Sequence, residues 1–159
     1  MSDCIDLHTH STESDGTDSP TGVVEAAIDA GVTVLALTDH DTTTGWAEAE
    51  RVVRNRPDAP TLVRGMEMSC TGRGEDGDPV TVHLLAYLFD ADDRALKEER
   101  RRLRAERDTR LRSMIGKMAA AGYAVDADEI LDEAGGSAGR PHLARALVKL
   151  GVVASVGDA

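Results

Sequence analysis

A mainly apolar segment at residues 32–37 (VTVLAL) is followed at once by the four polar residues 38–41. A short run of this kind is typical of a strand buried on both faces of a parallel sheet. In α/β sheets, functional residues gather just beyond the carboxyl ends of the strands. The segment therefore indicates an α/β fold with polar chemistry at one strand end.

Strands and helices alternate along the first 90 residues. Residues 4–10 alternate apolar and polar side chains, as a short strand does. A helix is expected from Pro20, capped by Ser19, to a stop at Gly31. The remaining elements expected here are a helix at 43–55, strands at 61–68 and 80–89, and a glycine-rich loop at 72–79. This order predicts a parallel α/β arrangement.

After residue 90 the pattern becomes helical. The expected helices span residues 92–121, 126–134 and 141–150. Gly122 ends the first of them, and Gly135, Gly136 and Gly139 form a turn before the last, which starts with a proline. We interpret this block as an insertion or cap on the α/β part.

Charge is distributed unevenly along the chain. The net charge is −11, which opposes extended contact with a nucleic-acid backbone, and we find no DNA-binding motif. Residues 94–112, however, hold nine basic and four acidic side chains, so this segment is +5 and the rest of the chain is −16. The segment indicates a local anion site, with a solvated helix laced with ion pairs as the alternative.

Composition also bears on location. No apolar stretch of about 18 residues occurs, so no transmembrane helix is expected. The first residues lack the basic and apolar segments of a secretory signal. Cys4 and Cys70 are too few for a disulfide framework. A cytoplasmic location without membrane attachment is therefore expected.

Candidate metal ligands stand at or near the ends of the expected strands. His8 and His10 are two residues apart, so on a strand both imidazoles point to one face and can grip one ion or neighbouring ions. Asp15 follows them before Gly16, where a plain turn is the alternative. His40 lies between Asp39 and Asp41, whose carboxylates could orient its ring.

Two further strands are interrupted by ionisable residues. Glu67 breaks the apolar run that begins at Leu62, and His83 breaks the run from Val80 to Leu88. A lone buried carboxylate is costly unless it is paired or bound to a metal. The alternative for each residue is a surface position on an edge strand. Taken together, the strand-end signals favour a metal site.

Two arginines fall inside the apolar face of the expected helix 92–121. That face is defined by Leu96, Leu103 and Met114. At about 100° per residue, Arg107 lies roughly 20° to one side of this face and Arg110 roughly 40° to the other. Arg101 and Arg112 point away from it. Inward arginines need an anionic partner, which is either a protein carboxylate or a phosphate.

These motifs together resemble the PHP (polymerase and histidinol phosphatase) family. Residues 6–10 (DLHTH) with 14–16 (SDG) are similar to its first motif, and residues 37–41 (LTDHD) to its second. Residues 65–67 (GME) and 82–84 (VHL) match the third and fourth. The resemblance implies a distorted (β/α)7 barrel holding two or three Mn, Zn or Fe ions, with manganese expected and magnesium as an alternative. The implied ligands are His8, His10, Asp15, His40, Glu67 and His83.

The resemblance covers only the N-terminal half of such barrels, whose later half supplies further strands and ligands. We accordingly expect a metal-binding barrel segment at 1–90, a helical insertion at 91–150 and a truncated tail at 151–159. The insertion and residues 137–142 (SAGRPH) resemble the subgroup of 3′,5′-nucleoside bisphosphate phosphatases and enzymes that trim RNA 5′ ends. Phosphate ligands expected in that subgroup are Arg107, Arg110, Arg140 and His142; His142 has a structural role as its alternative.

The function hypothesis is hydrolysis of nucleotide phosphate monoesters by a metal-bound hydroxide, with Asp15 and His40 as the catalytic candidates. The expected substrate is a small phosphorylated nucleotide or a short RNA 5′ end, and no oligomeric state is predicted. One alternative is a non-catalytic module that binds metal or phosphate. Another is a different PHP enzyme, histidinol phosphatase or a polymerase-associated exonuclease, which the insertion with residues 139–142 disfavours.

Overall fold

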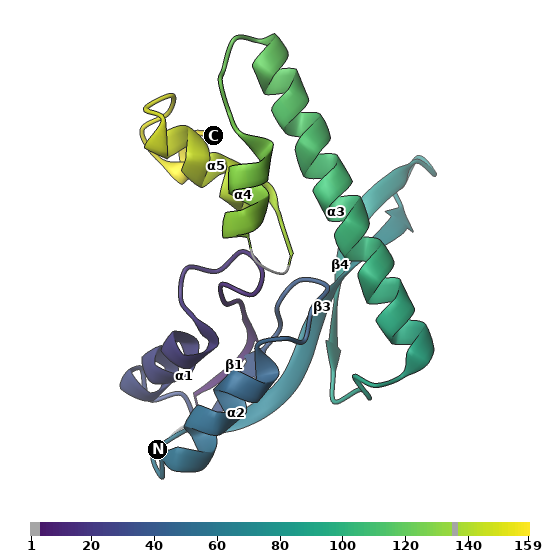
Figure 1. The fold of residues 1–159 in the computed structure, drawn as a ribbon. Helices are drawn as coiled ribbons and strands as arrows, with labels where there is room; N and C mark the ends of the chain where they lie inside the picture. The colour runs from purple at the N-terminus through teal and green to yellow at the C-terminus, as the bar shows by residue number, and fades with distance from the viewer. Residues whose placement is uncertain (1–3, 135–136) are drawn as a thin grey trace.

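The computed structural model describes residues 4–134 and 137–159, and its first part is an α/β unit with a four-stranded sheet (Figure 1). The strands are β1 (Ile5–Thr9), β2 (Val34–Leu37), β3 (Thr61–Arg73) and β4 (Pro79–Tyr87). They lie in the order β1-β2-β3-β4, with β1, β2 and β3 parallel and β4 antiparallel to β3. The carboxyl ends of three parallel strands therefore meet at one edge.

Two helices cover one face of this sheet (Figure 1). Helix α1 (Pro20–Asp29) begins where the Ser19 hydroxyl accepts a hydrogen bond from the Gly22 amide, as expected from the sequence. Helix α2 (Trp46–Asn55) starts three residues later than predicted. The core between helices and sheet contains the buried residues Val24, Ala27, Leu35, Leu37, Trp46 and Ala49.

The hairpin of β3 and β4 corrects one prediction. The sequence predicts a loop at residues 72–79, but β3 runs to Arg73 and β4 starts at Pro79, so the connection spans only residues 74–78. Pairing continues through Gly72 opposite Val80. The conformational freedom of glycine predicts that the strand ends at Gly72. In the structure, however, pairing with the neighbouring strand continues through this residue.

The helical block after residue 90 consists of α3 (Arg94–Ala120), α4 (Ala127–Glu133), α5 (Arg140–Lys149) and the short 3-10 helix η1 (Val156–Asp158). Asp93 and Asp126 cap the first two helices through their carboxylates. The glycine turn predicted before α5 includes Gly135 and Gly136, which lie outside the described residues. A second core of Leu111, Ile115, Ile130, Ala134, Ala138 and Leu143 joins the three helices.

The sheet is curled like half of a barrel, and one hydrogen bond links its first and fourth strands. The Tyr87 hydroxyl donates a hydrogen bond of 2.7 Å to the Leu7 carbonyl oxygen. The Tyr87 ring passes close to Gly65 on the strand between them. On β1, Ile5 is 57% exposed and Leu7 is 40% exposed, so apolar surface of the edge strand stays uncovered within the described part of the chain.

Gly65 is required by this close approach. A Cβ atom added there would lie 2.7 Å from Thr38 Cγ2 and 3.0 Å from Tyr87 Cδ1. We expect Gly65→Ala to lower the free energy of unfolding by about 1–3 kcal/mol through overpacking, with a fall in Tm of roughly 2–4 °C per kcal/mol. Gly116→Ala, on α3 where the new methyl meets nothing within 4 Å, serves as the control and is expected to stabilise. Equal Tm values for both variants would contradict the assignment.

Candidate metal centre and phosphate cavity

Six ionisable side chains meet just beyond the carboxyl ends of β1 and β2, next to β3 and β4. His8 lies on β1 and His10 just after it, Glu67 lies within β3, and His83 lies on β4. His40 follows β2 and forms an isolated parallel bridge with Glu67. Asp15 comes from the loop after β1. The structure thus brings together all six side chains that the sequence singles out.

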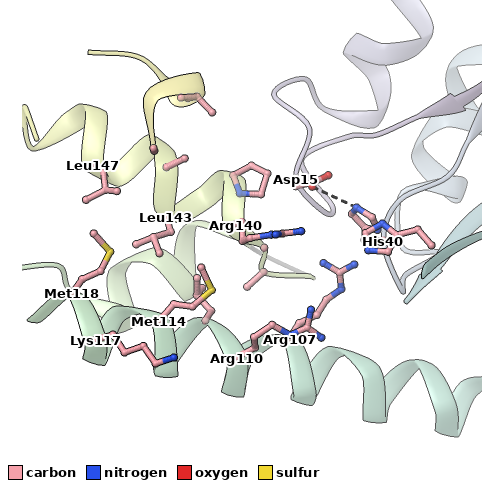
Figure 2. A pocket seen from close by; sticks show the side chains of 18 residues that line it. Asp15, His40, Arg107, Arg110, Met114, Lys117, Met118, Arg140, Leu143 and Leu147 are labelled. Carbon is pink, nitrogen blue, oxygen red and sulfur yellow. Dashed lines mark ion pairs between the residues drawn. The ribbon is translucent and has the colours of Figure 1, made fainter. Parts of the chain in front are cut away.

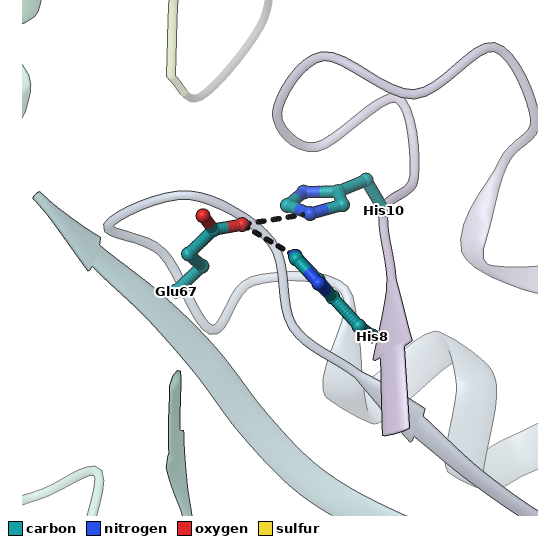
Figure 3. A group of neighbouring side chains, drawn as sticks. All are labelled: His8, His10 and Glu67. Carbon is teal, nitrogen blue, oxygen red and sulfur yellow. Dashed lines mark hydrogen bonds and ion pairs between the residues drawn. The ribbon is translucent and has the colours of Figure 1, made fainter. Parts of the chain in front are cut away.

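Glu67 is at the centre of this group (Figure 3). Its Oε2 atom lies 2.7 Å from His8 Nε2, 2.9 Å from His10 Nε2 and 3.7 Å from His40 Nδ1. Its Oε1 atom lies 2.7 Å from His83 Nδ1. One buried carboxylate therefore faces four imidazoles, a set of donors that borderline divalent metals prefer.

The donor atoms form three overlapping groups: His8, His10 and Glu67; His10, Asp15 and His40; and His40, Glu67 and His83. Within each group the ligand atoms lie within 4.8 Å of one another. Ligands bound to one ion at about 2.1 Å lie within roughly 4.3 Å of each other, so these groups need only small adjustments to close on a cation. The geometry therefore fits the binding of divalent ions at this place.

His40 offers an independent test of the fit. Its ring is 7% exposed, and its Nδ1 atom has no hydrogen-bond partner among the described residues. Burying a ring nitrogen without a partner is costly unless a hydrogen-bond donor or a metal ion binds its lone pair. Burial, followed by the charge of Arg107, lowers the pKa of His40 to about 4. The ring is therefore neutral at neutral pH, which is the form that binds a metal.

Glu67 is held in its charged form. Burial alone would raise the pKa of this carboxyl group, but hydrogen bonds from His8 and His83 and the nearby imidazoles of His40 and His10 outweigh burial and lower the pKa. A carboxylate at neutral pH is the form required for a metal ligand.

Asp39 positions the loop that carries His10 and Asp15. Its buried carboxylate accepts hydrogen bonds from the Ser11 amide and hydroxyl, each 2.7 Å long, and from the Ser14 hydroxyl at 2.6 Å. Asp15 Oδ1 then lies 3.4 Å from His10 Nδ1, and its Oδ2 lies 3.5 Å from His40 Nε2. The sequence suggests that the aspartates beside His40 orient its ring; Asp39 instead fixes the neighbouring loop.

Asp41 also does not orient the ring of His40. It joins the sheet to α3. Its carboxylate accepts hydrogen bonds from the Ser69 amide at 2.8 Å and hydroxyl at 2.7 Å, and from Arg107 Nε. Arg107 Nη2 also donates to the Ser69 hydroxyl at 2.8 Å. Of the two partners considered for this inward arginine, the structure provides a protein carboxylate. Asp41 adopts φ 54°, a left-handed backbone conformation that aspartate tolerates.

A cavity of about 810 Å³ opens beside His40, Asp15 and His83 (Figure 2). Arg107, Arg110, Lys117 and Arg140 line it together with apolar side chains of α3 and α5. Arg140 and Arg107 point toward His40 and Asp15 in Figure 2. The cavity therefore joins the candidate metal ligands to a cationic wall, which is the arrangement needed to hold a phosphate.

His142 lies apart from that wall. Its Nδ1 atom accepts a hydrogen bond of 3.1 Å from the Gly139 amide at the start of α5. Burial, followed by the charge of Arg145, lowers its pKa. Among the described residues His142 lines a different, smaller cavity with Arg145. Its contacts are those of a helix-capping residue, and its role in binding phosphate stays a prediction.

Two features of the site escape sequence reasoning. The long-range contacts of Asp39 and Asp41 cannot be read from spacing. Arg100 is not singled out by the sequence, although it is 8% exposed and lies seven residues before Arg107 on the same face of α3. That seven-residue interval is the signal that could have found it, since it places both guanidinium groups on one side of the helix.

No helix among the described residues is long and apolar enough to span a bilayer. The family model of the PHP domain matches residues 6–143. A 5′-3′ exoribonuclease from Haemophilus influenzae is 35% identical over the whole chain, which covers 56% of that relative. A 3′,5′-nucleoside bisphosphate phosphatase from Chromobacterium violaceum is 36% identical over 94% of the chain and 50% of the relative. The chain thus spans about half the length of these proteins.

Solved structures give the same result. An amidohydrolase from Chromobacterium violaceum with bound sulfate superposes with a TM-score of 0.83 at 34% identity, covering 96% of this chain and 52% of that one. A protein described as a metal-dependent phosphoesterase from Bifidobacterium adolescentis has a TM-score of 0.84 at 30% identity, covering 100% and 54%. With its four motifs gathered around Glu67 and the family match extending over most of its length, this chain belongs to the PHP domain family.

Proposed function

We propose that this chain forms the N-terminal part of a metal-dependent phosphoesterase that hydrolyses phosphate monoesters of nucleotides, either 3′,5′-nucleoside bisphosphates or RNA 5′ ends. The observation that carries the proposal is the convergence of four histidines and two carboxylates beside a cavity lined by arginines. The names of the relatives, a bisphosphate phosphatase and exoribonucleases, support the nucleotide class.

In this proposal the side chains divide the work between cation and substrate. His8, His10, Asp15, His40, Glu67 and His83 hold two or three divalent ions, with manganese expected and zinc, iron or magnesium as alternatives. When bound, such ions supply Lewis acidity and a water of lowered pKa. Asp15 is only 3.5 Å from His40 and faces the cavity, so its carboxylate can hold a proton from the attacking water.

The arginines orient the phosphate. Arg110 and Arg140 line the cavity, where their guanidinium groups can donate hydrogen bonds to the phosphoryl oxygens. Arg107 is fixed by Asp41 and Ser69 but also faces the cavity. Its guanidinium group is a rigid positive charge that stabilises an anionic transition state without reorganising. We further propose a cytoplasmic location, which fits two free cysteines.

The second candidate is a non-catalytic module that binds metal or phosphate. It is favoured by one observation: the His8 side chain is half exposed, so one side of the candidate centre is open. Metal retention without turnover would favour this module, whereas both together would favour the phosphoesterase.

Metal analysis followed by a turnover assay separates these candidates. We expect the chain to bind Mn²⁺ and release phosphate from adenosine 3′,5′-bisphosphate. We expect Arg140→Ala to raise KM for the bisphosphate by about 10-fold to 100-fold, as loss of a charge-assisted hydrogen bond of ~1.5–3 kcal/mol implies. KM for a simple aryl phosphate is expected to change much less. Arg94→Ala, on the same helix block but outside the cavity, is the control; equal changes for both substrates would argue that Arg140 is structural.

A further inference from the structure

A second cavity of about 320 Å³ is lined in part by Asp41, whose carboxylate pairs with Arg107. One wall is the N-terminal half of α3 and the other is the loop between β2 and α2. The residues that line it are Asp41, Thr42, Thr43, Thr44, Lys97, Arg100, Arg101 and Arg104. Four cations and three hydroxyl groups thus surround a space that the proposed phosphoesterase chemistry does not use.

Arg100 is built into this cavity rather than lying on the surface. It is only 8% exposed, and its guanidinium group donates to the Thr43 hydroxyl and, at 2.8 Å, to the Ala91 carbonyl oxygen. Its Nε atom is buried and has no hydrogen-bond partner among the described residues. A buried arginine without a carboxylate partner is costly, and an anionic ligand is one way to offset that cost.

The carboxylates around the cavity neutralise only part of its positive charge. Asp41 is taken by Arg107 and Ser69, Asp92 pairs with Lys97, and Glu13 accepts from the Thr44 hydroxyl. Arg101 and Arg104 make no ion pair among the described residues. Burial, followed by the nearby charge of Arg104, lowers the pKa of Arg100, and the charge of Asp92 opposes this shift. In a chain of net charge −11, this cavity is a concentrated positive region.

We propose that this cavity binds a phosphate group, and specifically a phosphodiester of an RNA chain whose 5′ end occupies the candidate metal centre. The choice of RNA rests on the proposed function; the anion site rests on the cavity itself. Arg104, Arg101 and Arg100 precede Arg107 on α3 by three to seven residues, which is about 5–11 Å along the helix. An RNA chain with several phosphates can contact both cavities at once.

The test is binding of 5′-phosphorylated, 3′-fluorescein-labelled oligoadenylates of two and six nucleotides, measured by anisotropy in EDTA at several salt concentrations. We expect the chain to bind the hexamer better than the dimer. We expect Arg101→Gln combined with Arg104→Gln to weaken hexamer binding by about tenfold. The slope of log affinity against log salt should also fall by ~0.7 for each phosphate that the variant no longer neutralises. Dimer binding should change little.

Arg94→Gln combined with Arg112→Gln removes the same charge from α3 outside the cavity and should keep the preference for the longer chain. A preference retained in the cavity variant, or abolished equally in both variants, would overturn the proposal. Competition by inorganic phosphate without any length preference would identify a free-anion site and also overturn it. Because binding is measured without metal, a length preference in a chain that fails to hydrolyse bisphosphate would support this inference while removing the phosphoesterase proposal.

Discussion

Glu67→Gln is expected to weaken Mn²⁺ binding by more than 100-fold and to remove phosphoesterase activity. Glutamine keeps the size of the side chain but loses the charge that four imidazoles face within 3.7 Å. Changes in residues that only support a metal ligand typically cost about 10–100-fold in affinity, so removal of a carboxylate common to two of the three donor groups should cost more. Isothermal titration with Mn²⁺ and a turnover assay measure the two effects.

The matched control is Glu50→Gln, which removes the same charge at a carboxylate paired with Arg64 on the other side of the sheet. This variant should bind Mn²⁺ like the parent chain. Thermal unfolding without metal should show that Glu67→Gln remains folded. Parent-like Mn²⁺ affinity in folded Glu67→Gln would mean that the imidazoles and Glu67 form only a structural cluster.

Asp41→Asn is expected to lower the free energy of unfolding by about 3–5 kcal/mol, because it leaves the charge of Arg107 buried without a counter-charge. Both side chains are at most 8% exposed, so water cannot replace the missing partner. Asparagine tolerates the left-handed backbone at this position, and the substitution therefore tests the charge rather than the conformation. Chemical denaturation monitored by circular dichroism measures the change.

Glu99→Gln provides the comparison, since it breaks an ion pair with Arg102 in which both side chains are largely exposed. Exposed pairs contribute about 0–1 kcal/mol, so the two variants should differ severalfold in their effect. Combining Asp41→Asn with Arg107→Met should recover part of the stability, because no buried charge then remains. A double variant no more stable than the single one would show that Arg107 does not depend on Asp41.

The positions of the helices and strands were predictable because they depend on local signals. Ser19 and Pro20 mark the start of α1, and the apolar run before Thr38 marks β2. The six candidate ligands could also be identified from the sequence, because ionisable residues in apolar strands are costly without a partner. Strand order then brings those side chains to one edge, which follows from the parallel arrangement rather than from any single residue.

The supporting contacts were not predictable, because they depend on chain segments far apart in the sequence. Asp39 reaches Ser11 and Ser14 across 25 or more residues, and Asp41 reaches Arg107 across 66. The hairpin length was also missed, since Gly72 breaks a pattern that cross-strand pairing restores. Arg100 became recognisable only from its burial against Thr43 and Ala91.

The hydrogen bond from Tyr87 to Leu7 affects the entropy of cation binding. Because the outermost strands are tied together by the protein itself, the spacing of the imidazoles does not have to be created by the ion. The conformational entropy that a flexible site would lose on binding a metal ion has already been lost during folding. Titration of Tyr87→Phe with Mn²⁺ should therefore show the same stoichiometry as the parent chain but a less favourable entropy of association.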